Sequence, residues 1–142
     1  MLGFLKKSQE PSVTQRLWKV PLHVGRGSST EMPANLAGAY VFVYVGAPNH
    51  EAALKAAVMH VRSRGYEFLD LHGGQVLQLE PSKWQSYINS TWAEHRSHFP
   101  TQAEVISKLS QGFVFCGPFA SYERAAQQGA QADEPASGGP AA

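Results

Sequence analysis

The pattern of apolar and polar residues first predicts a strand over residues 13–24, where the two kinds of residue alternate. The apolar face carries Trp18, Val20, Leu22 and Val24. The opposite face carries Lys19, Pro21 and His23. Because Pro21 has no N–H to donate to a neighbouring strand, we expect this segment at an edge of the sheet.

Residues 39–45 (AYVFVYV) are apolar on both faces, which indicates a central strand that is covered on both sides. A helix is expected to follow, with Asn49 as its N-cap and Gly65 as its left-handed C-cap. Its apolar stripe consists of Leu54, Ala57, Val58 and Val61.

Residues 66–71 and 76–80 both have the composition of strands, and they enclose Gly73 and Gly74. A Gly-Gly pair between two strands is typical of a hairpin, so we expect these strands to pair with each other. Their register stays open. A two-residue turn would place Phe68 opposite Leu79, and a bulged loop would place Leu69 and Leu71 beside Leu79 and Leu77.

A complete amphipathic stripe predicts a helix that begins near Ser82 and ends before Pro100. The stripe consists of Trp84, Tyr87, Ile88, Thr91, Trp92 and His95. Thr101 and Glu104 have the spacing of a capping box, so a further helix is expected there, ending at Gly112.

The last predicted strand covers residues 113–119 and is expected to be broken or bulged at Gly117 and Pro118. From residue 39 onward the order is therefore strand, helix, strand, strand, helix, strand. This order is the layout of an α+β fold, a ferredoxin-like sandwich. We expect an antiparallel sheet with helices on one face and an extra N-terminal edge strand.

The 142 residues are enough for one domain, which we place at residues 13–124. Residues 1–12 are expected to form a flexible N-terminus. Residues 125–142 contain no aromatic or large aliphatic side chain, so they are expected to form a disordered tail.

Composition and charge exclude several classes of function. With 12 Lys+Arg against 11 Asp+Glu, the formal net charge of +1 excludes the cationic field of a general nucleic-acid binder. Cys116 is the one cysteine, so no disulfide can form within the chain. No apolar run reaches the ~18 residues of a membrane span. We therefore expect a cytoplasmic protein without membrane or nucleic-acid partners.

Candidate catalytic groups are few. His95 and His98 have a spacing that can bind a metal, with Glu94, His60 or Cys116 as a third ligand, but the pair lacks a carboxylate motif, so neither a metal site nor a cofactor is expected. No catalytic motif surrounds any residue, and none is assigned as catalytic. A small enzyme would need a pocket that gathers at least two of the remaining candidates: His60, Asp70, His72 and Cys116.

The aromatic residues are more informative, because they make up 11% of the chain while charged residues make up only 16%, against ~25% in an ordinary domain. Trp and Tyr are enriched at the centres of protein interfaces. The candidates for partner binding are Trp18, Trp84, Tyr87 and Trp92, although an amphipathic stripe of this kind favours core positions for Trp84 and Trp92. A small sheet covered on one face only would expose such a surplus of rings.

The order of the segments 40–45, 66–71, 84–92 and 113–122 resembles that of small bacterial cytoplasmic proteins. Some of those proteins neutralise a cognate toxin by blocking its active site. The resemblance implies a non-catalytic protein-binding module of the immunity type, and self-association through sheet edges belongs to the same class. The alternative is a small pocket-type enzyme or a ligand-binding α+β dimer.

Overall fold

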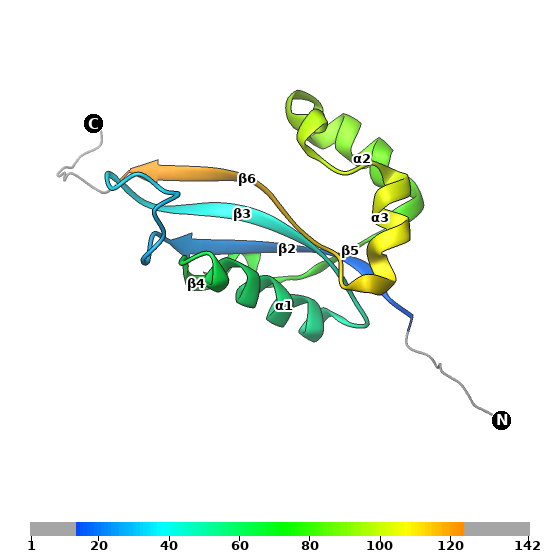
Figure 1. The fold of residues 1–142 in the computed structure, drawn as a ribbon, viewed down its shortest axis with the longest axis horizontal. Coiled ribbons are helices and arrows are strands. Elements are labelled where there is room, and N and C mark those ends of the chain that lie inside the picture. Colours follow the sequence, from blue (N-terminus) through cyan, green and yellow to red (C-terminus); the bar gives the residue numbers. More distant parts are fainter. Residues whose placement is uncertain (1–13, 124–142) are drawn as a thin grey trace.

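The computed structural model describes residues 14–123, which form an antiparallel sheet with helices packed against both faces (Figure 1). The strands are β2 (Arg16–Gly25), β3 (Leu36–Ala47), β4 (Glu67–Leu71), β5 (Leu77–Leu79) and β6 (Val114–Glu123). The helices are α1 (His50–Ser63), α2 (Trp84–Thr91) and α3 (Gln102–Lys108), with short 3-10 turns between elements. The α+β class and the antiparallel sheet are thus confirmed. The expectations for residues 1–12 and 125–142 lie outside the described residues.

The local signals for helix ends are confirmed. The Asn49 side chain accepts a hydrogen bond from the Ala52 N–H at 2.8 Å, which caps α1. Thr101 and Glu104 form the expected capping box at the start of α3. Gly65, just after α1, has a φ of +89°, the left-handed conformation that glycine adopts without strain.

The first described strand is internal, which contradicts the prediction of an N-terminal edge strand. β2 pairs with β3 along its whole length, and on its other side with β4 and β5. β4 pairs with residues 22–25 of β2, and β5 pairs with residues 17–19. Pro21 falls in the gap between these two partners. The missing N–H is therefore tolerated inside the sheet, because β2 has a neighbour on only one side at that point.

The predicted hairpin is also wrong, because β4 and β5 pair with β2 and not with each other. Leu71 lies opposite Leu22 and Leu79 lies opposite Leu17, so the two strands run in the same direction as one interrupted edge. Gly73, with a φ of +78°, turns the chain out of the sheet and back in the same direction. Both proposed registers fail for this reason.

The same pairing changes the expected sheet order. In a ferredoxin-like sheet the strand predicted at 76–80 would lie beside the strand at 39–45. In this protein β2 occupies that central position, between β3 and the interrupted edge of β4 and β5. The sheet order is β4-β2-β3-β6, with β5 continuing the edge along β2. The bulge expected in the last strand is confirmed, because Val43 pairs with Cys116 whereas Val41 pairs with Phe119.

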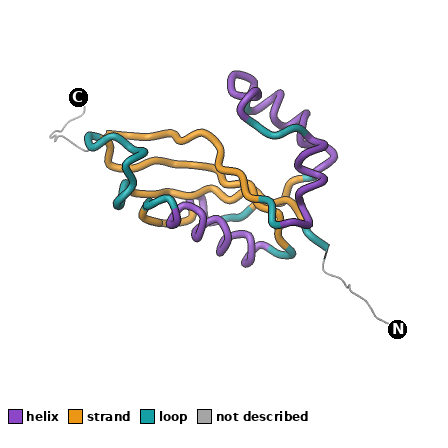
Figure 2. The backbone as a smooth tube through the Cα atoms, viewed as in Figure 1, coloured by secondary structure: helices purple, strands orange, loops and turns teal. Residues whose placement is uncertain are grey.

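The prediction of helices on one face is wrong. α1 packs on one face, where it buries Ala53, Ala57 and Val61 against the aliphatic side chains of β2 and β3. α2 and α3 lie on the other face, over one end of the strands (Figure 2). That second core holds Leu17, Tyr44, Trp84, Ile88, Phe99, Val105, Leu109 and Phe113. The cause is the alternation along β3, which places the valines toward α1 and Tyr44 toward α2 and α3.

Candidate binding surface

The face of the sheet opposite α1 is only partly covered. Figure 1 shows α2 and α3 at one end of the strands, and no α-helix of residues 14–123 covers the other end of that face. Tyr40 and Tyr122 are 39% and 36% exposed there. We call this surface the open face and define it by Lys19, Pro21, His23, Tyr40, Phe42, Asp70, His72, Trp92, Ala120 and Tyr122.

A chain of polar groups crosses the open face. The Tyr122 hydroxyl lies 2.6 Å from His23 Nε2, and His23 Nδ1 lies 3.4 Å from an Asp70 carboxylate oxygen. When the neutral imidazole carries its proton on Nδ1, Tyr122 donates to Nε2 and the Nδ1–H faces Asp70. Partial desolvation, with the nearby Tyr40 and Asp70, raises the pKa of Tyr122, so its hydroxyl stays protonated at neutral pH.

The strand register brings these three polar side chains together from β4, β2 and β6. His23 lies opposite Asp70 on β4 and opposite Tyr40 on β3. Tyr122 lies opposite Gly38, where a Cβ would come within 2.6 Å of both the Tyr122 hydroxyl and the Val24 carbonyl oxygen. Glycine at position 38 therefore allows the Tyr122 ring to lie across the sheet.

Tyr40 is the centre of the aromatic contacts on this face. Its ring stacks on His23 with a centroid distance of 4.6 Å and an interplanar angle of 20°. The His72 ring lies 4.7 Å and the Tyr122 ring 5.7 Å from it. We call His23, Tyr40, His72 and Tyr122 the histidine–tyrosine cluster. Each ring is held by at least one other, so the cluster is ordered before any partner arrives.

An apolar hollow of about 260 Å³ lies between this cluster and α2. It is lined by Pro21, Leu22, Tyr40, Val41, Phe42, His72, Trp92, Pro118 and Ala120. We call it the open-face hollow.

A buried network fixes the Trp92 side of the hollow. The Trp92 Nε1–H donates to the Tyr44 hydroxyl at 2.9 Å, and the Tyr44 and Tyr87 hydroxyls lie 2.6 Å apart. Tyr44 is fully buried, and burial raises its pKa far above the ordinary tyrosine value. The Tyr44 hydroxyl therefore stays neutral and orients both rings.

The structure separates the aromatic residues predicted to bind a partner. Trp18 and Trp84 are 7% and 1% exposed, and their indole N–H groups donate to the carbonyl oxygens of Ala47 and Pro100. These two side chains belong to the cores. Tyr87 and Trp92 are partly exposed, and Trp92 belongs to the open face.

The four pocket candidates do not come together. His60 and Cys116 lie on the α1 side, near Arg64. Asp70 and His72 lie on the open face, where Asp70 contacts His23 and His72 contacts Tyr40. Burial raises the pKa of the Cys116 thiol to about 11, which keeps it protonated and weakly nucleophilic at neutral pH.

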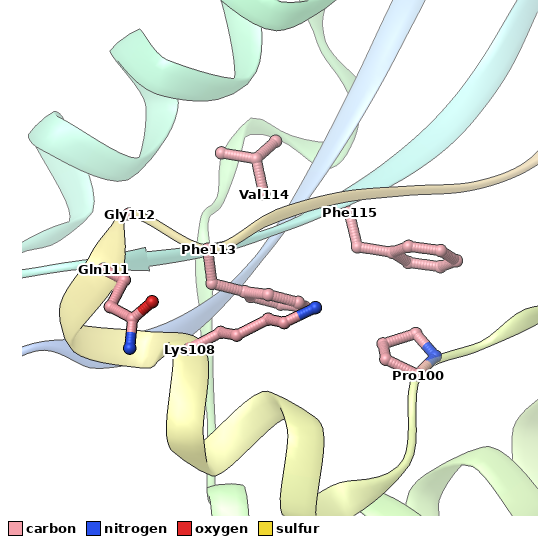
Figure 3. A pocket seen from close by; sticks show the side chains of 7 residues that line it. All are labelled: Pro100, Lys108, Gln111, Gly112, Phe113, Val114 and Phe115. Atoms are coloured by element: carbon pink, nitrogen blue, oxygen red, sulfur yellow. The ribbon is translucent and has the colours of Figure 1, made fainter.

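A second hollow, of about 330 Å³, lies between β6 and the segment from Pro100 to the end of α3. Figure 3 shows the Lys108 side chain extended beside the Phe113 ring, with Pro100 and Phe115 beyond. Lys108 is the one charged side chain that lines it, and no acid or histidine joins it there. This hollow therefore carries no acid–base pair.

Two further kinds of site were sought in the part of the chain that the structure describes: metal sites and membrane-spanning helices. Across residues 14–123, no cluster of three or more His, Cys, Asp or Glu is arranged to hold a metal ion. Over the same range, no helix combines the length and the hydropathy needed to cross a bilayer.

No family model matches the chain, and no curated protein or solved structure is similar enough to count as a match. The function must therefore be argued from the site alone.

Three residues of the cluster did not emerge from the sequence as candidates: His23, Tyr40 and Tyr122. A partial signal existed for His23, which alternation places on the polar face of its strand. No such signal existed for Tyr40, because it lies in a segment that is apolar on both faces of its strand.

Proposed function

We propose that this protein is a non-catalytic protein-binding module and that its partner covers the open face. The observation that supports the proposal is an exposed histidine–tyrosine cluster on a sheet face with no helix above it. The separation of His60 and Cys116 from Asp70 and His72 also favours binding over catalysis, because no pocket joins these groups among the described residues.

The physical case rests on rings that are already ordered. Tyrosine side chains supply large contact areas at low entropic cost, and buried tyrosines are frequent hot spots of interfaces. Tyr40 is stacked and Tyr122 is hydrogen-bonded to His23 before binding. A partner that covers them therefore does not have to order them, which favours affinity.

A finer form of the proposal follows from the layout resemblance. In that form the protein acts in a bacterial cytoplasm as an immunity-type protein, and the open face covers the active site of a cognate toxin. Self-association through sheet edges is the other member of this class.

Affinity purification from the native cells, with quantified recovery, tests the proposal. We expect a stoichiometric protein partner that is lost by at least about tenfold in Tyr40→Ala/Tyr122→Ala. The matched control is Met59→Ala, which removes a 60% exposed side chain from α1 on the other side of the sheet. Equal recovery with both variants would contradict the proposal, as would a monomer without a partner.

A second candidate, a small acid–base enzyme, is favoured by the chain from Asp70 through His23 to Tyr122. This candidate predicts a small molecule that stays bound in native mass spectrometry and is turned over by the wild type. Turnover is then expected to disappear in His23→Gln and in Tyr122→Phe. A purified complex with a protein and no small molecule would contradict it.

A further inference from the structure

The open-face hollow has the chemistry of a ligand site. Its lining includes Phe42, Trp92, Pro21 and Pro118, and its volume is about 260 Å³. An apolar cavity of about 150 Å³ in another protein stays dry and binds benzene. The hollow is therefore large enough for one planar ring system with a short substituent.

Two polar groups at the rim of the hollow can still form hydrogen bonds. Among the described residues, neither the Tyr40 hydroxyl nor the His72 ring makes a hydrogen bond, although both line the hollow. Both are free to bond a further polar group of a bound ligand.

A positive charge, that of Lys19, lies beside the hollow. The Lys19 amine lies 4.8 Å from the centre of the Phe42 ring and 5.5 Å from that of Tyr87. Within the described chain, no carboxylate forms an ion pair with Lys19. Asp70, the acid of the open face, already pairs with His23. An uncompensated ammonium beside an apolar floor favours an anionic ligand.

We infer that the open-face hollow binds a small planar aromatic carboxylate, with its ring between Phe42, Trp92 and Pro118 and its carboxylate toward Lys19. The ring displaces water from apolar walls, which supplies the affinity. Lys19 supplies the preference for an anion over a neutral analogue of the same shape. The inference concerns the free protein and does not depend on a protein partner.

Titration of the ¹⁵N-labelled full chain with indole-3-acetate tests it, with indole-3-acetamide as the neutral match. The indole N–H signal of Trp92 reports on the hollow, while those of the buried Trp18 and Trp84 serve as internal references. We expect saturable shifts at Trp92 with a Kd in about the millimolar range, and weaker binding of the amide.

Variants distinguish the contribution of the apolar contacts to ligand affinity from that of the Lys19 charge. Ala120→Leu fills the hollow and is expected to weaken the binding of both probes at least about tenfold. If Ala120→Leu does not fold, Phe42→Leu replaces it as the test, because it removes part of the hollow's apolar lining. Lys19→Gln is expected to weaken the carboxylate up to about fivefold and to leave the amide unchanged. Lys55→Gln, on the exposed side of α1, is the matched control and should change neither.

Three results would overturn the inference. These are the absence of saturable shifts at Trp92 up to about 10 mM probe, equal affinities for the carboxylate and the amide, and shifts that centre on the second hollow near Lys108. None of them bears on the protein-partner proposal, because the titration is done on the protein alone.

Discussion

The buried hydroxyl of Tyr44 gives the sharpest stability prediction. In Tyr44→Phe the ring and its packing remain, but the hydroxyl bonded to Tyr87 at 2.6 Å and to Trp92 at 2.9 Å disappears. Each hydrogen bond contributes about 1 kcal/mol, and Trp92 keeps only a long 3.4 Å contact with Tyr87. We expect a loss of about 2 kcal/mol in the free energy of unfolding, which lowers Tm by about 7–9 °C.

Urea unfolding followed by tryptophan fluorescence, together with calorimetry, measures this loss. Tyr40→Phe is the control, because the Tyr40 hydroxyl makes no hydrogen bond among the described residues and its removal should change stability by less than about 0.5 kcal/mol. A double-mutant cycle of Tyr44→Phe with Tyr87→Phe should give a coupling of about 0.5 kcal/mol or more. Equal losses in Tyr44→Phe and Tyr40→Phe would refute the network.

Three further predictions follow. The hydrogen bond from Arg64 is the largest cause that lowers the pKa of Glu31, so this carboxylate stabilises the fold above its ordinary pKa of 4.5, and that stability is lost as the pH falls through the folded value. Glu31→Gln should remove that part of the pH dependence in urea unfolding, and an unchanged profile would contradict it. The Cys116 thiol, with a pKa of about 11, should react with a thiol reagent far more slowly at pH 8 in the folded protein than in urea, and equal rates would disprove its burial. Gly38→Ala should cost more than about 1 kcal/mol, because its Cβ meets the Val24 carbonyl oxygen at 2.6 Å, and a wild-type Tm would show that the strands yield there.

The features that the sequence predicted well are local. The Asn49 cap, the Thr101–Glu104 capping box and the left-handed Gly65 each depend on residues within one helical turn. The bulge at Gly117 and Pro118 is also local, because proline and glycine restrict or free their own backbone angles.

The pairing of strands was not predicted, for a physical reason. A Gly-Gly signal shows that the chain turns at Gly73, but a 3-10 turn and a hairpin turn use the same residue type. Which strand fills the centre of the sheet depends on β2, whose Pro21 argued for an edge. That argument failed because the neighbouring edge is interrupted opposite Pro21.

The residues of the candidate site could not be predicted from the sequence for the same reason. The bond between His23 and Tyr122 joins residues separated by 99 positions, and only the strand order brings them together. Asp70 lies beside His23 because of the register of β4 against β2, and no local pattern in the sequence shows that pairing. Trp18 was expected at an interface because its strand was expected at an edge, but its side chain lies in the core on the α1 face of the sheet.

Footprinting of the purified complex tests the open face most directly. Hydroxyl-radical labelling, with and without the partner, reports the accessibility of single side chains by mass spectrometry. We expect strong protection of Tyr40 and Tyr122 in the complex and unchanged labelling of Met59 on α1. Protection of Met59, with Tyr40 and Tyr122 labelled as in the free protein, would contradict the claim that the partner covers the open face.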